Sequence, residues 1–264
     1  MQQLAGKVVW ITGASSGIGE ALAYACVRRG CKVILSARRV EELERVKNQT
    51  GKPDWVHIVP LDLSQTEAVA ELAAAAHQHW GRIDILINNG GISQRETVDK
   101  TQLMVDRRIM EVNYFGQIAL TKAVLPYMLS QGAGHIAAIS SLTGKFGFPL
   151  RSAYAASKHA LHGFFESLYL ELKDQGIGVT LVNPGRIRTH ISLHALTGDG
   201  KEHQQMDPGQ DKGMTAEVCA RKILRAIARQ KVEVNIGGTE ILMIYFKRYV
   251  PWLFRWIAGR VEAK

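Results

Sequence analysis

Apolar, β-branched runs alternate along this chain with segments in which apolar residues recur at helical spacing. Runs of this kind are typical of strands buried on both faces, and the helical segments between them are typical of crossover connections. The runs predict strands at Lys7–Thr12, Lys32–Ala37, Val56–Val59, Ile83–Asn88, His135–Ser140, Val179–Asn183 and Glu233–Asn235. The helical segments lie at Gly17–Arg29, Val40–Gln49, Gln65–His79, Asp99–Ser130, Ala153–Gln175 and Ala216–Arg229. We therefore expect an α/β fold with a doubly wound parallel sheet of Rossmann type, in three α/β/α layers.

The connections between these elements are short, with no linker and no internal repeat, which favours one domain over residues 1–240. One connection, residues 186–214, is long, rich in Gly and polar residues, and follows the carboxyl end of a strand. Ligands bind at that edge of open α/β sheets, so we interpret the segment as a lid, with an incidental surface insertion as the alternative. Its glycines would give backbone freedom for opening, at Gly198, Gly200, Gly209 and Gly213.

The composition, with 46% hydrophobic and 22% charged residues among 264, is that of an average soluble globular protein. The formal net charge of +9 is spread along the chain, and neither zinc-finger spacing nor a basic module with aromatic residues is present. We therefore expect a basic enzyme that binds an anionic cofactor, and no nucleic-acid partner. Three cysteines are too few for a disulfide framework and lack metal-ligand spacing, and no signal-peptide core follows Met1, so we expect a cytoplasmic protein.

Tyr154 and Lys158 carry the most specific chemistry in the chain. Their i, i+4 spacing places both side chains on one helical face. An ammonium beside a phenol favours the phenolate and is expected to lower the pKa of Tyr154. The pair therefore predicts a tyrosine that exchanges a proton near neutral pH.

Four further motifs precede this pair in the order Thr12-Gly13-Ala14-Ser15-Ser16-Gly17-Ile18-Gly19, Asn88-Asn89-Gly90-Gly91, Asn113 and Ser140-Ser141. Together with Tyr154 and Lys158, the set resembles the classical short-chain dehydrogenase/reductase family, from about Lys7 to Thr189. The resemblance implies an NAD(P)-dependent oxidoreductase that interconverts a carbonyl and an alcohol by hydride transfer.

The glycines at 13, 17 and 19 follow a strand and open a helix, where backbone amides and the helix dipole favour a pyrophosphate. Their spacing by itself is equally compatible with a tight structural turn. In the family that the chain resembles, this spacing marks the cofactor site, and the matching Ser15, Ser16 and Ile18 contact the cofactor.

The cofactor preference is predicted from the residues after the second strand. No carboxylate stands there to bond the ribose hydroxyls, and Arg38 and Arg39 offer guanidinium groups for a 2′-phosphate. We expect NADP(H) rather than NAD(H). The alternative is that both arginines are simply solvated at the helix start, an end at which the dipole disfavours cations.

The remaining cofactor contacts are implied by the resemblance. Asp62 and Leu63 close the third strand, where the family's aspartate meets the adenine, although Asp62 could equally cap the following helix. Asn89, Gly90 and Gly91 match the family's Asn-Asn-Ala-Gly segment, with glycine in place of alanine at 90. Pro184, Gly185, Ile187 and Thr189 fall in the Pro-Gly-x-x-x-Thr segment, which orients the carboxamide.

The resemblance also assigns the catalytic roles. Tyr154 is the proton donor in reduction and the base in oxidation, and Lys158 lowers its pKa and binds the nicotinamide ribose. Ser141, thirteen residues before the tyrosine, bonds the substrate oxygen, while Ser140 supports it or the strand end. Asn113 holds a water that connects the lysine to solvent. Helix propensity alone would place a lone Asn there on a solvated face.

Nine histidines invite a metal interpretation, but His77-x-His79 and His159-x-x-His162 come without a companion carboxylate or cysteine set. We expect no metal. His190 and His194, on the predicted lid, are placed to touch substrate. The residues expected near the substrate are mostly apolar and predict a lipophilic ketone, aldehyde or alcohol; they are Leu142, Thr143, Phe146, Phe148 and Ile187.

The carboxyl-terminal segment, residues 241–264, is apolar and basic, and its 241–260 part is interrupted by Pro251 and too short to span a membrane. Subunit packing or covering the active-site mouth, a peripheral membrane contact, and simple core completion remain open. We expect a homodimer or homotetramer that pairs, as similar enzymes do, through helices near Asp99–Ser130 and Ala153–Gln175. A non-catalytic dinucleotide-sensing or membrane-associated protein on the same fold is the alternative function.

Overall fold

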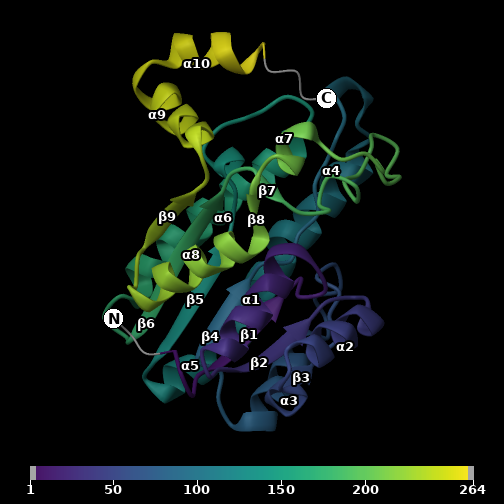
Figure 1. The fold of residues 1–264 in the computed structure, drawn as a ribbon. Coiled ribbons are helices and arrows are strands. Elements are labelled where there is room, and N and C mark those ends of the chain that lie inside the picture. Colours follow the sequence, from purple (N-terminus) through teal and green to yellow (C-terminus); the bar gives the residue numbers. More distant parts are fainter. Residues whose placement is uncertain (1–3, 261–264) are drawn as a thin grey trace.

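A computed structural model describes residues 4–260 and contains one seven-stranded sheet, in which every neighbouring pair of strands is parallel (Figure 1). The strand order is β3-β2-β1-β4-β5-β6-β9. The strands are β1 Val8–Thr12, β2 Lys32–Ser36, β3 Val56–Ile58, β4 Ile85–Asn88, β5 Gly134–Ile139, β6 Ile177–Pro184 and β9 Glu233–Ile236. Each predicted strand is present, and the order reverses between β1 and β4, where open sheets of this kind bind ligands.

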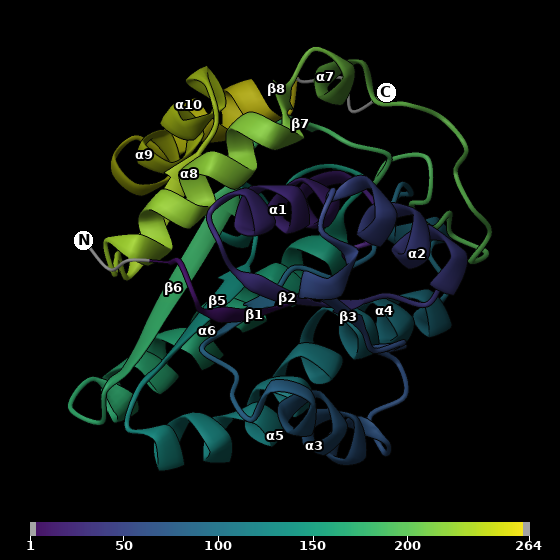
Figure 2. The same cartoon turned by 60° about the horizontal axis from the view of Figure 1, so that its bottom comes forward.

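Helices cover both faces of the sheet, which confirms the predicted three-layer architecture (Figure 2). One face is covered by α1 Gly17–Arg28, α2 Val40–Gln49 and α8 Ala216–Ala228, and the other by α3 Val69–Trp80, α5 Gly116–Gln131 and α6 Ser152–Leu172. Each layer buries its own apolar cluster against the central strands, whose residues are hydrophobic on both sides.

The helical segment predicted near Asp99–Ser130 is present as a continuous helical run over residues 103–131, but it begins four residues later than predicted and contains a π turn that was not predicted. A 3₁₀ turn at Val98–Lys100 precedes α4, Leu103–Met110, and a π-helical turn at Glu111–Phe115 joins α4 to α5. The helix predicted from Gln65 begins only at Val69, because residues 61–68 form the loop that follows β3. Helical periodicity alone does not reveal an inserted π turn, since apolar spacing is nearly preserved across it.

The predicted lid, residues 186–214, is held in place at several points. Its ends form the short parallel pair β7 Ile187–Arg188 and β8 Met214–Thr215, and α7, Pro208–Asp211, lies shortly before β8. Leu196 bonds with the segment after β4, accepting from Arg95 N at 2.9 Å and donating to Ser93 O at 2.8 Å.

The glycines of the lid were predicted to give backbone freedom for opening, but the conformation of residues 186–214 indicates another role for two of them. Of the four, Gly200 has a positive φ, 85°, whereas a Cβ on Gly198 or Gly213 would collide with a neighbouring backbone carbonyl. These two glycines therefore permit close packing.

The carboxyl-terminal segment forms two helices, α9 Leu242–Tyr249 and α10 Pro251–Ala258, beyond the carboxyl end of β9 (Figure 1). Its last residues, 261–264, and the first three of the chain lie outside the described part. Within residues 4–260, no helix has the length and apolar character needed to cross a bilayer.

Candidate active site

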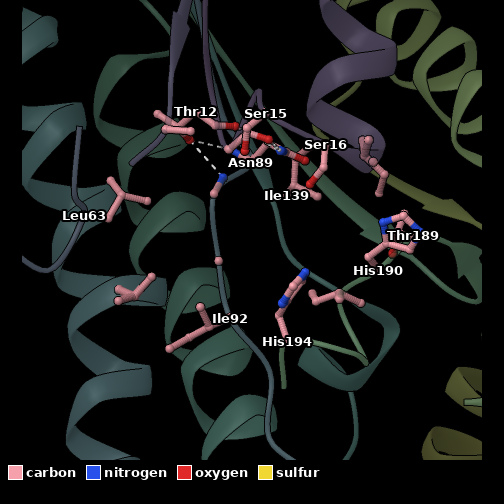
Figure 3. A pocket seen from close by; sticks show the side chains of 18 of the residues that line it. Thr12, Ser15, Ser16, Leu63, Asn89, Ile92, Ile139, Thr189, His190 and His194 are labelled. Atoms are coloured by element: carbon pink, nitrogen blue, oxygen red, sulfur yellow. Dashed lines mark hydrogen bonds between the residues drawn. The ribbon is translucent and has the colours of Figure 1, made fainter. Parts of the chain in front are cut away.

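A cavity of about 480 Å³ lies along the carboxyl edge of the sheet. Its walls come from the ends of six strands, β1 to β6, and from residues 187–210. Figure 3 shows Leu63 and Ile92 on one side of this cavity and Thr189 and His190 on the other. Parallel strands bring these segments together, because all their carboxyl ends meet at one edge of the sheet.

The loop after β1 forms a tight cradle. Gly13 and Gly17 have φ values of 62° and 59°, which only glycine adopts readily. A Cβ on Gly19 would collide with Gly13 O, so this glycine provides packing and does not itself line the cavity. No side chain caps the first turn of α1, which leaves its amides directed at the cavity edge.

The segment after β4 is hydrogen-bonded to this cradle. Thr12 Oγ1 accepts from the amides of Asn89 and Gly90 at 3.0 and 2.9 Å, and Asn89 Nδ2 donates to Thr12 O (Figure 3). A Cβ on Gly90 would lie 2.6 Å from Leu63 Cδ1. Glycine at 90 therefore makes room for Leu63.

Two arginines stand at the end of β2, as predicted. Ser36 is buried and donates to Val59 O, whereas the side chains of Arg38 and Arg39 are exposed along the cavity. Neither guanidinium takes part in the ion pairs formed by residues 4–260. Two free cations at this place suit a phosphate ligand.

Asp62 closes a turn in the loop after β3. Its Oδ1 accepts from the amide and hydroxyl of Ser64, at 2.9 and 2.8 Å, and α3 begins only at Val69, seven residues after Asp62. Burial raises the pKa of Asp62, but these bonds and the charges of Arg38 and Arg108 outweigh burial and hold the pKa below its usual value. The side chain is thus an ionised acceptor on the cavity wall, and it does not cap α3.

Ser141, Tyr154 and Lys158 come together at the end of β5 and on α6, and all three line the cavity. Ser141 Oγ accepts from Thr143 N at 3.2 Å and from Thr143 Oγ1 at 3.0 Å. Because a hydroxyl has two acceptor positions and one proton, the proton of Ser141 is left to donate to another group. Lys158 Nζ donates to Ile139 O at 2.9 Å and lies 5.7 Å from the ring centre of Tyr154.

The expected lowering of the Tyr154 pKa by Lys158 is wrong for this arrangement. Burial raises the pKa of Tyr154 and outweighs the lowering by a hydrogen bond with Ser141 and by the charges of Arg151 and Arg95. Burial also lowers the pKa of Lys158 to about 8. Desolvation opposes both charged forms. It dominates because Arg151 and Arg95 offset the burial of Tyr154 only in part, and Lys158 has no carboxylate partner within residues 4–260.

Asn113 lies in the π turn, fully buried behind the cavity wall. Its Oδ1 accepts from Ile92 N, and its Nδ2 donates to Ile92 O and to Ser157 Oγ. The solvated-face alternative is therefore excluded. Ser140 Oγ donates to Lys158 O at 3.1 Å, so it links the end of β5 to the helix that carries the lysine, whereas support of Ser141 or of the strand end was expected.

The other predicted cofactor residues line the cavity; they are Ser15, Ser16, Ile18, Gly91, Pro184, Gly185, Ile187 and Thr189. Of the residues expected near substrate, Leu142 and Phe146 pack instead against Phe254 and Ala258 of α10. His190 and His194 line the cavity, together with Leu196 and Glu202, which the sequence did not single out.

A buried ion-pair cluster ties the lid to the catalytic helix. Asp207 Oδ2 lies 2.6 Å from Arg95 Nη2 and 2.7 Å from Arg151 Nη2, and Arg151 immediately precedes α6. Burial raises the pKa of Asp207, but bonding and charge from Arg95 outweigh it and keep the carboxyl ionised. No local pattern announces this cluster, because 112 residues separate Asp207 from Arg95.

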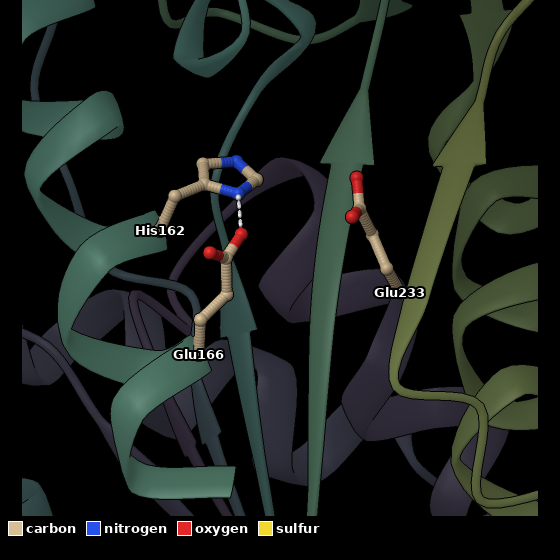
Figure 4. A group of neighbouring side chains, drawn as sticks. All are labelled: His162, Glu166 and Glu233. Carbon is tan, nitrogen blue, oxygen red and sulfur yellow. Dashed lines mark ion pairs between the residues drawn. The ribbon is translucent and has the colours of Figure 1, made fainter. Parts of the chain in front are cut away.

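Histidines on the helices mostly pack against other rings. His77 stacks on Tyr127 and His79 on His57. The statement that His162 lacks companion carboxylates is wrong, because Glu166 and Glu233 lie beside it (Figure 4). The Lys145 ammonium already lies 3.0 Å from Glu233 and 3.8 Å from Glu166, so we interpret the group as an ion-pair network and assign it no metal.

A dinucleotide suits this cavity on three grounds. The glycine cradle has no room for Cβ atoms, the first turn of α1 is uncapped, and two guanidiniums stand free at the end of β2. Together with the strand order, these features define the class of protein as a dinucleotide-binding α/β protein.

Comparison with known proteins identifies the family. The short chain dehydrogenase model matches residues 7–197. The chain is 45% identical to the Drosophila melanogaster dehydrogenase/reductase SDR family protein 7-like, over 99% of this chain and 82% of that protein. It is 41% identical to the human dehydrogenase/reductase SDR family member 7, over 99% and 79%.

Two solved structures share the fold. A short-chain dehydrogenase from Streptomyces avermitilis is 32% identical with a TM-score of 0.81, covering 96% of this chain and 97% of that chain. A Burkholderia phymatum short chain dehydrogenase/reductase in complex with NAD is 25% identical with a TM-score of 0.85, covering 96% of each chain. The chain belongs to the short-chain dehydrogenase/reductase family and is an oxidoreductase that uses a nicotinamide dinucleotide.

Proposed function

We propose that this protein is an NADP(H)-dependent reductase of lipophilic ketones or aldehydes, with Tyr154 as the proton donor. The observation that carries this proposal is the convergence of Tyr154, Ser141 and Lys158 on a cavity whose far end holds the free guanidiniums of Arg38 and Arg39.

The protonation state of Tyr154 is compatible with its role as proton donor in reduction. Because burial raises its pKa above the ordinary value of 10.0, the phenol keeps its proton at neutral pH. When bound, a reduced nicotinamide would supply the hydride for the carbonyl carbon. Ser141 steadies the carbonyl oxygen by donating the proton that otherwise bonds Tyr154, and Tyr154 delivers its own proton to that oxygen as negative charge develops.

Lys158 and Asn113 act as supports in this proposal. Lys158 would hold the nicotinamide ribose, and Asn113 fixes Ile92 and Ser157 through hydrogen bonds. Ile92, Ile191 and Leu196 line the cavity and support an apolar substrate, and the polar side chains beside them come from the lid, namely His190, His194 and Glu202.

The reaction is tested by following NADPH oxidation with steroid, retinal, quinone and oxoacyl carbonyls. The most active substrate is then assayed with Tyr154→Phe, which removes the transferable proton and should lower kcat at least about 10³-fold. Tyr169→Phe on the same helix is the matched control, and it should retain full turnover. Near-normal turnover by Tyr154→Phe would refute the mechanism.

The cofactor preference is tested separately through kcat/KM for NADPH and NADH. Arg38→Ala with Arg39→Ala should lower the value for NADPH by roughly 10²-fold, since two charge-assisted bonds to the 2′-phosphate are lost, and leave NADH nearly unchanged. Arg221→Ala, an exposed arginine of α8 outside the cavity, should change neither. A higher kcat/KM with NADH in the unaltered enzyme would overturn the preference.

The oligomeric state remains a prediction. The prediction of subunit pairing is supported by apolar side chains that are exposed on or between the helices expected to pair. These are Leu103, Met104, Phe115, Leu129 and Leu170. Sedimentation equilibrium should give a dimer or tetramer mass, and Leu170→Glu should reduce it.

A further inference from the structure

The helices α9 and α10 expose more aromatic surface than any other part of the described chain. Tyr245, Tyr249, Trp252 and Trp256 are 50%, 71%, 65% and 55% exposed, and Phe115 is the one other large aromatic side chain exposed within residues 4–260. Exposed aromatic side chains in such density mark a contact surface.

Both helices are two-sided. On α10, Phe254 and Ala258 face inward, and Phe254 meets Phe146 edge-on at 5.4 Å between ring centres. Trp252 and Trp256, one turn apart, face outward. On α9, Leu242, Tyr245 and Tyr249 form an exposed stripe at i, i+3 and i+7 spacing. The inner faces complete the fold, and the outer faces are left to meet something else.

The charge on this surface has one sign. The stretch 242–260 contains no Asp or Glu, whereas Lys247, Arg248, Arg255 and Arg260 are all exposed. Arg260 lies over the ring of Trp256 at 4.1 Å, and Arg248 lies 5.9 Å from that of Tyr249. Aromatic side chains flanked by cations match the interface of an anionic bilayer, where rings sit at headgroup level and cations meet lipid phosphates.

We propose that α9 and α10 form a monotopic contact with an anionic membrane surface. Each helix is 8 residues long, about 12 Å, and cannot cross a hydrocarbon core of about 30 Å. A second copy of the chain fits less well, since a two-fold interface would bring two cation-rich, acid-free faces together.

The position of this surface relates it to the cavity. β9 ends at Ile236, at the same sheet edge as the cavity, and leads through a short turn into α9 (Figure 1). α10 packs on Leu142, the residue next to Ser141. A membrane bound by α9 and α10 therefore lies on the side of the protein where an apolar substrate would enter.

Vesicle cosedimentation of the full chain tests the proposal, with phosphatidylcholine vesicles that contain or lack phosphatidylserine. The unaltered protein should bind the anionic vesicles at low salt and dissociate from them at high salt. Trp252→Glu with Trp256→Glu should weaken binding about tenfold or more, and Lys247→Gln with Arg248→Gln roughly fivefold for each charge removed. Val98→Glu, which alters another exposed apolar residue far from α9 in the sequence, is the matched control and should bind normally.

Two measurements distinguish a folding defect from a loss of vesicle binding: the thermal unfolding midpoint and NADPH turnover with a water-soluble carbonyl. Both should be unchanged in all variants. The proposal is overturned if the unaltered protein ignores anionic vesicles, or if Val98→Glu loses binding equally. It is also overturned if the tryptophan variant converts a dimer to a monomer without changing vesicle binding, because a second copy would then be the occupant.

Discussion

The cradle of residues 12–19 and 88–91 and the lid of residues 186–214 enclose the same cavity but are held in different ways. In the cradle, backbones approach so closely that side chains are excluded, and amides bond to Thr12 and Gly13. The lid depends on Asp207, whose carboxylate bonds Arg95 and Arg151, and on the backbone bonds of Leu196. The cradle is therefore fixed by close backbone packing, and the lid is held mainly by the buried ion pairs of Asp207.

This difference indicates where movement can occur. Close backbone packing has no alternative arrangement of similar energy, whereas an ion-pair cluster can open once water reaches it. We therefore expect the cradle to stay rigid through turnover and the lid to respond to substrate.

The largest expected effect is on the cradle. Gly19→Ala introduces a Cβ that collides with Gly13 O and approaches Asn89 Nδ2. Because backbone must move, the free energy of unfolding should fall by about 3 kcal/mol, and cofactor binding should weaken with it. Urea unfolding and NADPH titration measure the two effects.

Gly163→Ala provides the control, because a Cβ there meets no atom within 4 Å on the exposed side of α6. It should stabilise the protein by up to about 1 kcal/mol. Equal unfolding energies for Gly19→Ala and the unaltered protein would show that the cradle tolerates movement and would remove the contrast with the lid.

A smaller effect is expected on the pH dependence of stability. It comes from Lys158, because this buried cation has no carboxylate partner within residues 4–260, whereas Arg95 is paired with Asp207. Lys158 has a backbone carbonyl as partner, and burial lowers its pKa from 10.5 to about 8. Between these values the unfolded chain binds more protons than the folded protein, so stability rises with pH. The cost of the buried ammonium is full below pH 8 and should fall by roughly 1 to 2 kcal/mol between about pH 8 and pH 9.5.

The difference between the unaltered protein and Lys158→Met in this pH range isolates that contribution, since tyrosines and thiols titrate alike in both. Urea unfolding at several pH values gives the slopes. Parallel slopes would mean that Lys158 keeps its ordinary pKa in the folded protein.

The smallest effect on turnover is expected at the lid. Asp207→Asn keeps the shape but leaves the buried guanidiniums of Arg95 and Arg151 without their shared carboxylate, so the free energy of unfolding should fall by about 3 kcal/mol and the lid should open more often. We expect KM for the carbonyl to rise about fivefold, with kcat and the KM for NADPH little changed. Faster hydrogen exchange in residues 190–207 would accompany it. An Asp199→Asn control alters an exposed lid carboxylate that does not line the cavity and should leave KM unchanged.

The sequence was sufficient for the sheet, its parallel strands and most of the cavity wall, because each depends on local pattern. Buried strands read as continuous apolar runs, and the Tyr154 and Lys158 spacing can be seen within one helix. The helical segment near Asp99–Ser130 was also predicted, but the π turn at Glu111–Phe115 within it was not, since a π turn leaves the helix continuous.

Other features became visible only in three dimensions. The carboxylates beside His162, the ion pairs of Asp207 and the packing of Leu142 on α10 each join residues that are distant in sequence. The pKa of Tyr154 is raised, whereas a lowering was expected. The i, i+4 spacing indicates that Lys158 lies near the phenol, but it does not indicate how deeply both groups are buried.

By itself, the order of residues determined the fold class, the family resemblance and the side chains available for chemistry, because hydrogen-bonding pattern and apolar period act over short distances. Only the tertiary structure decided which charges are desolvated, which are paired, and which wall of the cavity rests on an ion pair. Electrostatic energy depends on distance and burial, and neither is set until the chain has packed.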